Sequence, residues 1–477
     1  MKRALAATLF LTAGWLFPLQ AQFPEDALRF ATPGIGVGAR SLGMGNAYTG
    51  VANDFSALYW NPAGLAQLEY GEFSLGLSHL NYGNRSTFFD NQKSYSNNST
   101  TLNSLGLVFP VPTHRGSLVF AFGYARNSSF TTGLSFEGFN PVSSIIQTFA
   151  PDSLSYPADL SGNIAYQLYL ADVDTLTGLW DSRIRNRVTQ LGKVLEGGGV
   201  NHWSAAGAID IARNVSVGAT LTYATGSYSY DRSFVEQDDD GIHTVAPFDF
   251  DQLTLDEYVE SDLSGFNASL GLLYRVPERF RFGLTVRTPT AYQVREEDGI
   301  LARSAFDNGD IRPVDAPFES AGSREYDVLT PWVFSAGASV ILKHLMISAD
   351  VEYTDWTQLA FEDAGAELMA LNKEIKELFR PTANWRLGAE LDAADYGVRL
   401  RGGFMYSPSP FDGDPSSFDR KHVTGGLGIL LSEFTMLDLA YARGWWNSFR
   451  TNYVHPASRV EEKITTNNVI VTFSYRF

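Results

Sequence analysis

Charged side chains that could bind a ligand gather in the last third of the chain. Three arginines and three acidic residues are predicted to share the inward face of neighbouring strands: Arg386, Arg399, Arg401, Asp350, Glu352 and Glu390. A guanidinium binds a carboxylate through paired hydrogen bonds, so these arginines could contact the carboxylate of a ligand. Because the acids and bases are interleaved, mutual neutralisation in a salt-bridge ladder is the favoured interpretation.

The sequence contains no motif of a familiar catalytic class. It has no G-x-S-x-G, no H-E-x-x-H and no complete G-x-G-x-x-G, although residues 34–40 come near the last of these. The seven histidines are scattered without metal-ligand spacing, and the chain has no cysteine. The acidic run Asp238–Asp240 misses the spacing of a calcium loop. We therefore expect no enzyme activity, no metal and no cofactor.

The elements that must position the charged residues are strands with a period of two. In the last strand, one face carries Val469, Val471, Phe473, Tyr475 and Phe477, and the other carries Asn468, Thr472, Ser474 and Arg476. The same alternation recurs many times along the chain, and its polar face is rich in Gly, Ser, Thr and charge. Apolar residues toward lipid and polar or small residues toward a lumen are typical of a transmembrane β-barrel. Aromatic residues near strand ends, such as Trp385 and Trp445, suit a girdle at the membrane surface.

The first residues have the features of an export signal. Lys2 and Arg3 precede the apolar run Ala4–Leu19, and the small Ala21 closes a plausible cleavage site. We expect residues 1–21 to be a signal peptide, whose removal would change the formal net charge from −17 to −19. Such an acidic chain is not expected to bind nucleic acid. No later stretch approaches the roughly 20 apolar residues of a helical span.

These patterns predict an all-β fold, a 14-stranded antiparallel transmembrane β-barrel in the outer membrane of a Gram-negative cell. The barrel is expected over residues 68–477, with the first strand at about 69–82 and the last at about 464–477. An even number of strands places both chain ends in the periplasm, and the long loops outside the cell. These extracellular loops are predicted at about 132–199, 232–259, 297–326 and 358–381.

A barrel of fourteen strands would leak unless its lumen were filled. Residues 22–67 precede the first strand, are rich in glycine and alanine, and show no long amphipathic period. Small residues pack closely against a lumen wall, and glycine tolerates the irregular backbone that a plug requires. We therefore expect this segment to form an N-terminal hatch inside the barrel.

Two of the predicted loops carry apolar residues at helical spacing. The first stripe is Leu176, Trp180, Ile184, Val188, Leu191 and Leu195, and the second is Leu368, Leu371, Ile375 and Leu378. Such stripes must be buried against each other, the barrel rim or a ligand. Packing within the loops is the favoured interpretation, and an extracellular groove that collects hydrophobic ligands, formed by Leu176, Trp180, Leu368, Leu371 and Ile375, is the alternative.

The glycine-rich stretch Gly38–Ala66, with its Asn61-Pro62-Ala63-Gly64 motif, resembles the FadL/TodX family of outer-membrane transporters. The segments 350–356, 384–390, 400–410 and 437–442 are similar to later strands of that family, in the same order. The resemblance implies a channel that takes up hydrophobic compounds, either long-chain fatty acids or hydrocarbons. It also implies that Asn61, Pro62 and Ala63 face a kink in the third strand, beside a lateral opening.

The third predicted strand contains residues that could mark this kink. Gly123 would weaken strand pairing, and the polar pair Arg126 and Asn127 could interrupt it. The motif has a simpler interpretation as well, because Pro62 fixes φ and Asn61 could merely form the turn into the first strand. A lateral gate and a structural turn therefore both remain open for Asn61-Pro62-Ala63.

A second function is compatible with the same N-terminal stretch. Residues 43–64, with Tyr59-Trp60-Asn61-Pro62, also resemble PorV-type barrels, which bind and shuttle secreted proteins; the later strands favour the transporter. At the C-terminus, Phe473, Tyr475 and Phe477 resemble the signal read by the barrel-assembly machinery. The expected partners are therefore hydrophobic small molecules, outer-membrane lipid and that machinery.

Overall fold

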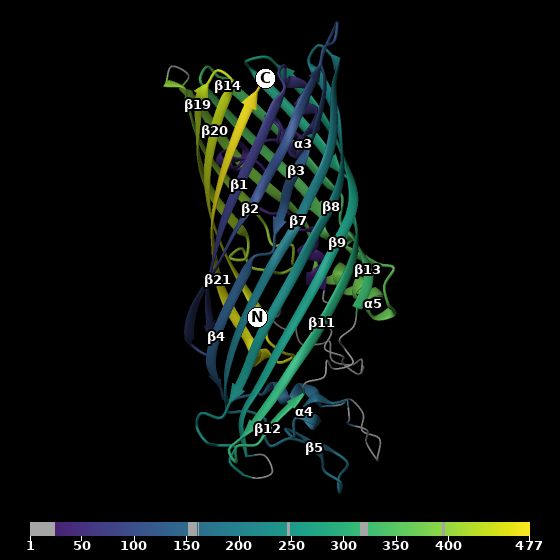
Figure 1. The fold of residues 1–477 in the computed structure, drawn as a ribbon, viewed down its shortest axis with the longest axis vertical. Coiled ribbons are helices and arrows are strands. Elements are labelled where there is room, and N and C mark those ends of the chain that lie inside the picture. The colour runs from purple at the N-terminus through teal and green to yellow at the C-terminus, as the bar shows by residue number, and fades with distance from the viewer. Residues whose placement is uncertain (1–23, 151–159, 161, 246–248, 315–322, 394–395) are drawn as a thin grey trace, which may run out of the picture.

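The computed structural model of the protein describes residues 24–150, 160, 162–245, 249–314, 323–393 and 396–477. The predicted signal peptide, residues 1–21, lies outside the described residues. The strands form one closed antiparallel barrel, because β1 (Glu72–Phe88) pairs with β2 (Asn91–Val111) on one side and with β21 (Arg459–Arg476) on the other (Figure 1). The predicted fold class is confirmed, and the wall has the fourteen strand positions expected.

Ten wall positions are single strands, and four are divided into two segments. The other single strands are β7 (Val188–Ala212), β8 (Val215–Gln237), β9 (Phe250–Val276), β17 (Pro381–Ala393), β18 (Val398–Ser407), β19 (Arg420–Ser432) and β20 (Thr435–Thr451). The divided positions are β3 (Leu118–Ser129) with β4 (Thr132–Asn140), β10 (Phe280–Arg287) with β11 (Ala291–Phe306), β13 (Ser323–Leu329) with β14 (Val333–Leu342), and β15 (Leu345–Asp355) with β16 (Ala360–Glu362). Strand β12 (Ile311–Val314) extends the sheet beside β11, and β5 (Asp172–Val173) forms a small hairpin with β6 (Trp180–Asp181).

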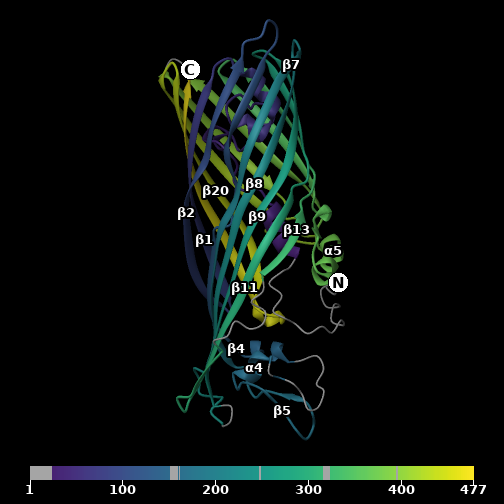
Figure 2. The ribbon, with the colours of Figure 1, turned by 45° about the vertical axis from the view of Figure 1, so that its right-hand side comes forward.

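One side of the barrel is much taller than a membrane requires. The outward residues of β8 are apolar from Val217 to Tyr223 and polar from Thr225 onward, at Ser227, Ser229 and Asp231. About 9–11 residues of a tilted strand cross a bilayer, whereas β7, β8 and β9 have 25, 23 and 27 residues. These strands therefore continue well beyond the lipid-facing band, while β14, β15, β17 and β18 have only 10 to 13 (Figures 1 and 2).

The predicted loop bounds 132–199, 232–259 and 297–326 are wrong for this reason. Residues 132–140 pair with residues 188–196 as strands, and β8, β9 and β11 extend through much of the other two ranges. Beyond the lipid-facing band the outward residues become polar, and inward residues such as Phe136 and Phe234 are apolar because they pack on the core next to residues 141–187. The outward apolar alternation that marks a membrane strand is therefore lost. The fourth range, 358–381, consists largely of loop and the helix α5 (Ala366–Leu378).

Helices occur inside the barrel and in the loops. The N-terminal ones are α1 (Pro24–Ala31), α2 (Ala39–Gly43), α3 (Ala57–Trp60) and the 3₁₀-helix η1 (Pro62–Gln67). Those in the loops are η2 (Ile145–Phe149), α4 (Ile164–Gln167), η3 (Trp356–Gln358), α5 and η5 (Pro456–Ser458). None of the described helices combines the length and the apolar character needed to cross a membrane.

The described parts of residues 141–187 form a cap at the end of the barrel opposite the C-terminus (Figures 1 and 2). The extracellular location of this end stays a prediction. Its core joins cap residues such as Ile145, Ile164 and Leu170 to Phe136 and Phe234 of the tall strands. The cap is thus held to the wall by a shared apolar core rather than standing free as a loop.

Candidate functional site

The N-terminal segment, residues 24–71, lies inside the barrel. Helix α2 packs on β18 to β21, and η1 packs on β7, β8 and β9. The side chains of Val37, Leu42, Tyr48 and Leu65 are fully buried between the segment and the wall. This segment includes most of the range expected to form a hatch, and its role as a plug stays a prediction.

Wall carboxylates bind this segment through charge-assisted hydrogen bonds. Glu390 of β17 accepts two bonds from the guanidinium of Arg40, at 2.7 and 2.8 Å. Asp350 of β15 accepts the backbone N–H groups of Tyr48 and Thr49, at 2.8 and 2.6 Å. Bonds to an ionised acceptor are stronger than neutral ones, so the segment is attached to the wall at defined points.

The Asn61-Pro62-Ala63 motif is buried where the segment turns toward β1. The amide nitrogen of Asn61 donates to the carbonyl oxygen of Thr49 at 2.8 Å and to that of Leu272 in β9 at 3.2 Å. Its side-chain oxygen accepts the N–H of Ala63 at 3.1 Å and so caps η1, in which Pro62 is the first residue. Asn61 therefore shapes the turn and also joins it to the barrel wall.

Glycines of the wall allow the motif to approach this closely. A Cβ atom on Gly271 would lie 2.2 Å from the Oδ1 of Asn61, and one on Gly218 would lie 2.5 Å from the carbonyl carbon of Pro62. Any larger residue at these positions of β8 and β9 would displace the motif.

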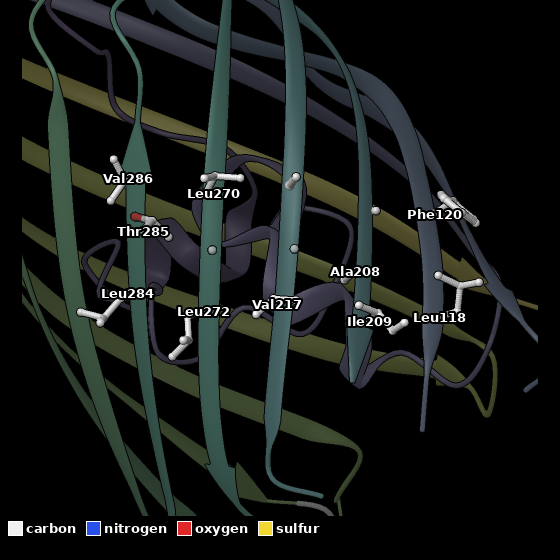
Figure 3. A pocket seen from close by; sticks show the side chains of 14 residues that line it. Leu118, Phe120, Ala208, Ile209, Val217, Leu270, Leu272, Leu284, Thr285 and Val286 are labelled. Carbon is white, nitrogen blue, oxygen red and sulfur yellow. The ribbon is translucent and has the colours of Figure 1, made fainter. Parts of the chain in front are cut away.

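A lipid-facing hollow lies directly across the wall from the motif. It has a volume of about 610 Å³, and Gly218 and Gly271 take part in its lining, with Leu270, Leu272 and Val286 around them (Figure 3). Strands β8 and β9 pair without a register shift across this region, so the wall is intact there. The hydrogen bonds and closest approaches of the motif are therefore with β8, β9 and β10. The helix η1, which begins at Pro62, also contacts β3. That the motif faces a kink in the third strand stays a prediction.

The third strand is irregular at a different part of the N-terminal segment. The pairing of β3 with β7 shifts register between Arg126 and Ser128, which leaves Asn127 in a β-bulge. The carbonyl oxygen of Asn127 accepts the N–H of Gly34 at 2.8 Å, and its side-chain oxygen accepts the hydroxyl of Tyr59 at 3.1 Å. The N-terminal segment thus contacts the bulge at two points.

The three residues expected at the kink differ in position. Asn127 lies in the bulge, and the adjacent Arg126 donates to the side chain of Asn201 and to the carbonyl oxygen of Gly198, at 2.8 and 2.6 Å. Gly123 lies in regular pairing with β2 and β7. Neither a lateral opening nor a gate follows from these positions alone, and both stay predictions.

A small internal chamber of about 40 Å³ separates the bulge from the opposite wall. Its polar lining consists of Asn127, His202, Asn267, Arg287, Thr288, Thr290, Thr330, Glu352, Thr354 and Asn384, with Phe30 of α1 and Trp356 beside them. It lies where β10 gives way to β11 and β13 to β14, at Pro289 and Pro331. A proline cannot donate to the sheet, so these strands are interrupted at the level of the chamber.

Two residues of this chamber keep unused binding capacity. Arg287 makes no ion pair with the described carboxylates. Its guanidinium carbon lies 5.2 Å from the centre of the Tyr59 ring, and one guanidinium nitrogen donates a weak hydrogen bond to the carbonyl oxygen of Tyr59, at 3.5 Å. The Nε2 atom of His202 is buried and has no hydrogen-bond partner among the described residues. The inward position of Arg287 in the alternation of β10 is the sequence signal that could have identified it.

The arginines singled out from the sequence make ion pairs with the wall. The pairs are Arg386–Glu352 at 2.8 Å, Arg399–Asp392 at 3.3 Å, Arg401–Glu390 at 2.6 Å and Arg401–Asp438 at 2.6 Å. Together with Arg40, which shares Glu390, they form the kind of ladder favoured above. Their contact with a ligand carboxylate stays a prediction.

The residues proposed for an extracellular groove lie in two separate places. Leu368, Leu371 and Ile375 belong to α5, a predicted helix that the structure contains, and they pack with α1 of the N-terminal segment. The helix predicted from Leu176 to Leu195 is wrong, because Trp180 lies in β6 and residues 188–195 lie in β7. The apolar residues of this range have helical spacing by chance, because they lie in a hairpin, a turn and the start of a strand.

The C-terminal residues complete the barrel. Phe473 and Tyr475 lie in β21, and the backbone of Phe477 exchanges two hydrogen bonds with Gly71, at 2.9 and 3.0 Å. The Phe477 side chain is exposed. Recognition of these residues by an assembly machinery stays a prediction. Across the described parts of the chain, no cluster of three or more His, Cys, Asp or Glu residues could hold a metal ion.

Comparison with known proteins gives one family. Residues 199–477 match the model of the family described as outer membrane protein transport protein (OMPP1/FadL/TodX). A search of curated proteins found no match.

Solved structures share the fold at low sequence identity. The Pseudomonas putida toluene transporter TodX is 13% identical with a TM-score of 0.53, covering 93% of this chain and 99% of its own. A Pseudomonas aeruginosa FadL homologue is 13% identical with a TM-score of 0.57, covering 94% and 99%. The Ralstonia pickettii toluene transporter TbuX is 17% identical with a TM-score of 0.50, covering 93% and 98%.

Proposed function

Because this chain belongs to the FadL/TodX family of outer-membrane transport proteins, we propose that it takes up long-chain fatty acids through the plugged barrel. The ligand enters at the extracellular end, on the side of the barrel where the strands are short and α5 lies. It passes the polar chamber and leaves beside the bulge of the third strand, β3. The observation that carries this route is the attachment of the N-terminal segment to Asn127. A shift of that segment would release both contacts with the bulge, through Gly34 and Tyr59.

The chamber favours an amphiphilic ligand over a pure hydrocarbon. A hydrocarbon chain that displaced water from Arg287, His202 and Asn267 would leave their polar groups unsatisfied, at a cost of roughly 1–3 kcal/mol for each. A carboxylate head group could instead accept hydrogen bonds from Arg287. Fatty acids fit this chamber better than alkanes or monoaromatic compounds do.

The gating role of the motif is tested by the double substitution Asn61→Ala/Pro62→Ala. We expect normal yields of folded barrel, measured by the heat-dependent shift on gels, and a severalfold fall in uptake of labelled oleate per folded molecule. The loss follows because the substituted segment is no longer held against β9. Reduced yield with normal uptake per folded molecule would mean that the motif only makes a turn.

The turn before β21 provides a matched control. There His455 caps η5 through the N–H of Ala457, and Pro456 is the first residue of that helix, as Pro62 is of η1. The variant His455→Ala/Pro456→Ala removes the same kind of turn at the opposite end of the barrel. It should leave uptake per folded molecule unchanged.

The ligand class is tested at Arg287. In the variant Arg287→Met, uptake of dodecanoate should fall about tenfold or more, because a charge-assisted hydrogen bond contributes about 1.5–3 kcal/mol. Uptake of dodecane should not fall. If wild-type cells accumulate dodecane as readily as dodecanoate, the ligand is a hydrocarbon and the head-group role of Arg287 is refuted.

The second candidate, a PorV-like partner of secreted proteins, is not favoured by the family match. Its test is direct: secreted proteins would co-purify with the barrel, and uptake of labelled oleate would be absent.

A further inference from the structure

The cap carries a hairpin whose tip is apolar and bare. Strands β5 and β6 pair through Asp172 with Asp181 and through Val173 with Trp180. Between them, Leu176 is 95% exposed and Leu179 is 65% exposed. In both views β5 lies near the end of the molecule farthest from the C-terminus (Figures 1 and 2). Large apolar side chains are therefore held at the part of the protein that extends farthest from the membrane.

The tip has a defined conformation. The N–H of Asp174 donates to the carbonyl oxygen of Leu179 at 2.9 Å, and the N–H of Gly178 donates to the carbonyl oxygen of Asp174 at 2.7 Å. The carboxylate of Asp174 accepts the N–H of Leu176 at 2.9 Å, and Gly178 has a φ of +68° that suits glycine. The leucines are thus presented by a closed turn and not by a loose strand.

The base of the hairpin is fixed to the cap. Trp180 packs against the apolar core of the cap. The hydroxyl of Ser182 donates to the carbonyl oxygen of the buried Leu170 at 2.9 Å. The base of the hairpin is therefore attached to the cap, while both leucines of the tip are exposed to solvent.

We propose that this hairpin makes contact with the surface of uncharged oil droplets, the phase in which the hydrophobic ligands of the channel are stored. The proposal rests on the proposed function, since it supplies the channel with its ligand. Two leucines are too small a surface for a stable protein partner, which needs about 800 Å² on each side. A fluid apolar phase needs no shape complementarity, and each leucine that enters it is stabilised by removal from water.

The charges beside the tip decide which apolar surface fits. Asp172 and Asp174 are exposed on the hairpin, Asp181 is paired with Arg185 at 3.3 Å, and Arg183 and Arg187 are exposed just after it. The three acids are therefore balanced by three arginines. Interfacial segments that bind anionic lipid surfaces carry basic residues around their apolar ones. The hairpin and its flank carry no net charge, so an anionic bilayer offers them no net attraction, and an uncharged oil–water interface is the apolar surface that suits them.

The test uses the double variant Leu176→Ser/Leu179→Ser in the full-length protein, displayed on outer-membrane vesicles. We expect adhesion of the vesicles to hexadecane droplets to fall about tenfold or more, because burial of a leucine is worth roughly 1.5–3 kcal/mol. Wild-type vesicles should not bind anionic phospholipid liposomes. Unchanged adhesion of the variant to hexadecane, or wild-type binding to the liposomes in preference to hexadecane, would overturn the proposal.

Val454 provides the control. It is 77% exposed in the turn between β20 and β21, at the same end of the barrel. The variant Val454→Ser removes an exposed apolar side chain without touching the hairpin, and it should leave adhesion to hexadecane unchanged. An equal loss in this variant would mean that adhesion depends on general surface hydrophobicity, which contradicts a specific role for the hairpin.

Uptake separates this proposal from the proposed function. Labelled oleate is offered either dissolved at low concentration or partitioned in hexadecane droplets. The hairpin variant should take up dissolved oleate at the wild-type rate and oleate from droplets severalfold more slowly. An equal fall in both uptake rates would place the hairpin in the transport path and refute droplet contact. If wild-type protein takes up no dissolved oleate, the proposed function fails, and vesicle adhesion still decides the role of the hairpin.

Discussion

Replacing Glu236 by glutamine should remove a pH dependence from the cap formed by residues 141–187. Glu236 lies near the end of β8, beyond the lipid-facing band, and its side chain is fully buried. It accepts hydrogen bonds from the hydroxyl of Ser144 at 2.6 Å, the N–H of Ile145 at 2.8 Å and the amide of Gln190 at 2.6 Å. These bonds join the cap to β7 and β8 through one carboxyl group.

Among the residues that the structure describes, no cation compensates this carboxyl. The elements around it contribute Asn140, Ser143 and Gln190, which are neutral, and Tyr453, whose pKa is raised by burial so that the phenol stays protonated. Burial raises the pKa of Glu236 from 4.5 to about 7, and the three hydrogen bonds oppose that rise only in part. The ionised form is therefore disfavoured in the closed cap.

The direction of the pH effect follows from the raised pKa. An acid with a higher pKa in the closed state binds its proton more tightly there, so the contribution of Glu236 to cap stability is complete below about pH 4.5. It is lost as the pH rises through about 7. A rise of the pKa from 4.5 to about 7 corresponds to about 3 kcal/mol, or roughly 300-fold in the closing equilibrium.

Hydrogen exchange of the cap measures this equilibrium. After correction for intrinsic exchange rates, protection of the amides of residues 141–149 should fall by up to about 300-fold between pH 4.5 and 8 in the wild type. The variant Glu236→Gln resembles the protonated form, and rotation of the Ser144 hydroxyl lets it accept a bond from the new amide. Its protection should stay constant with pH. A wild-type profile that is equally flat would refute the reasoning.

The remaining predictions concern the barrel wall. The variant Gly271→Val should displace Asn61, because even a Cβ atom at this position would lie 2.2 Å from the Oδ1 of Asn61. We expect small hydrophilic solutes to leak through this variant in a liposome-swelling assay, but not through Gly402→Ala, where the added Cβ meets open space. A Gly271→Val barrel that does not leak would contradict this. The variant Arg401→Met leaves the buried Asp438 without its ion-pair partner and removes one of the two arginines bound to Glu390, so it should destabilise the barrel by about 3–5 kcal/mol, seen as a lower temperature of the gel shift; an unchanged temperature would contradict it. Deletion of Phe477 removes two hydrogen bonds to Gly71 and should reduce the amount of heat-modifiable barrel in the outer membrane; normal amounts would rule out its role in assembly.

The chain's alternation of apolar and polar residues was enough to predict the barrel and its fourteen strands. That pattern is local, since each membrane strand must present apolar residues to lipid at every second position. Residues 215–223 carry it in full and lie in β8, and residues 469–476 of β21 carry it with Ile470 as the one exception. The family could likewise be recognised from a short motif, because Asn61-Pro62-Ala63 lies in a glycine-rich stretch ahead of these strands.

Only the tertiary structure decided where the strands end and what the motif touches. Beyond the lipid-facing band the outward residues of β8 are polar, while inward residues such as Val194 of β7 and Phe234 of β8 pack in the core of the cap. The outward apolar alternation therefore stops before the strands end, and the paired segments 132–140 and 188–196 were predicted as loop. The contacts of Asn61 with β9 and of Tyr59 with Asn127 join residues that are 211 and 68 positions apart. Such contacts depend on how strands are arranged around the lumen, which no local pattern contains. The same holds for the charges. The alternation in the sequence predicts that Arg287, Arg386 and Arg401 face inward. Only the folded barrel determines that neighbouring carboxylates neutralise Arg386 and Arg401, while Arg287 makes no ion pair with any carboxylate that the structure describes.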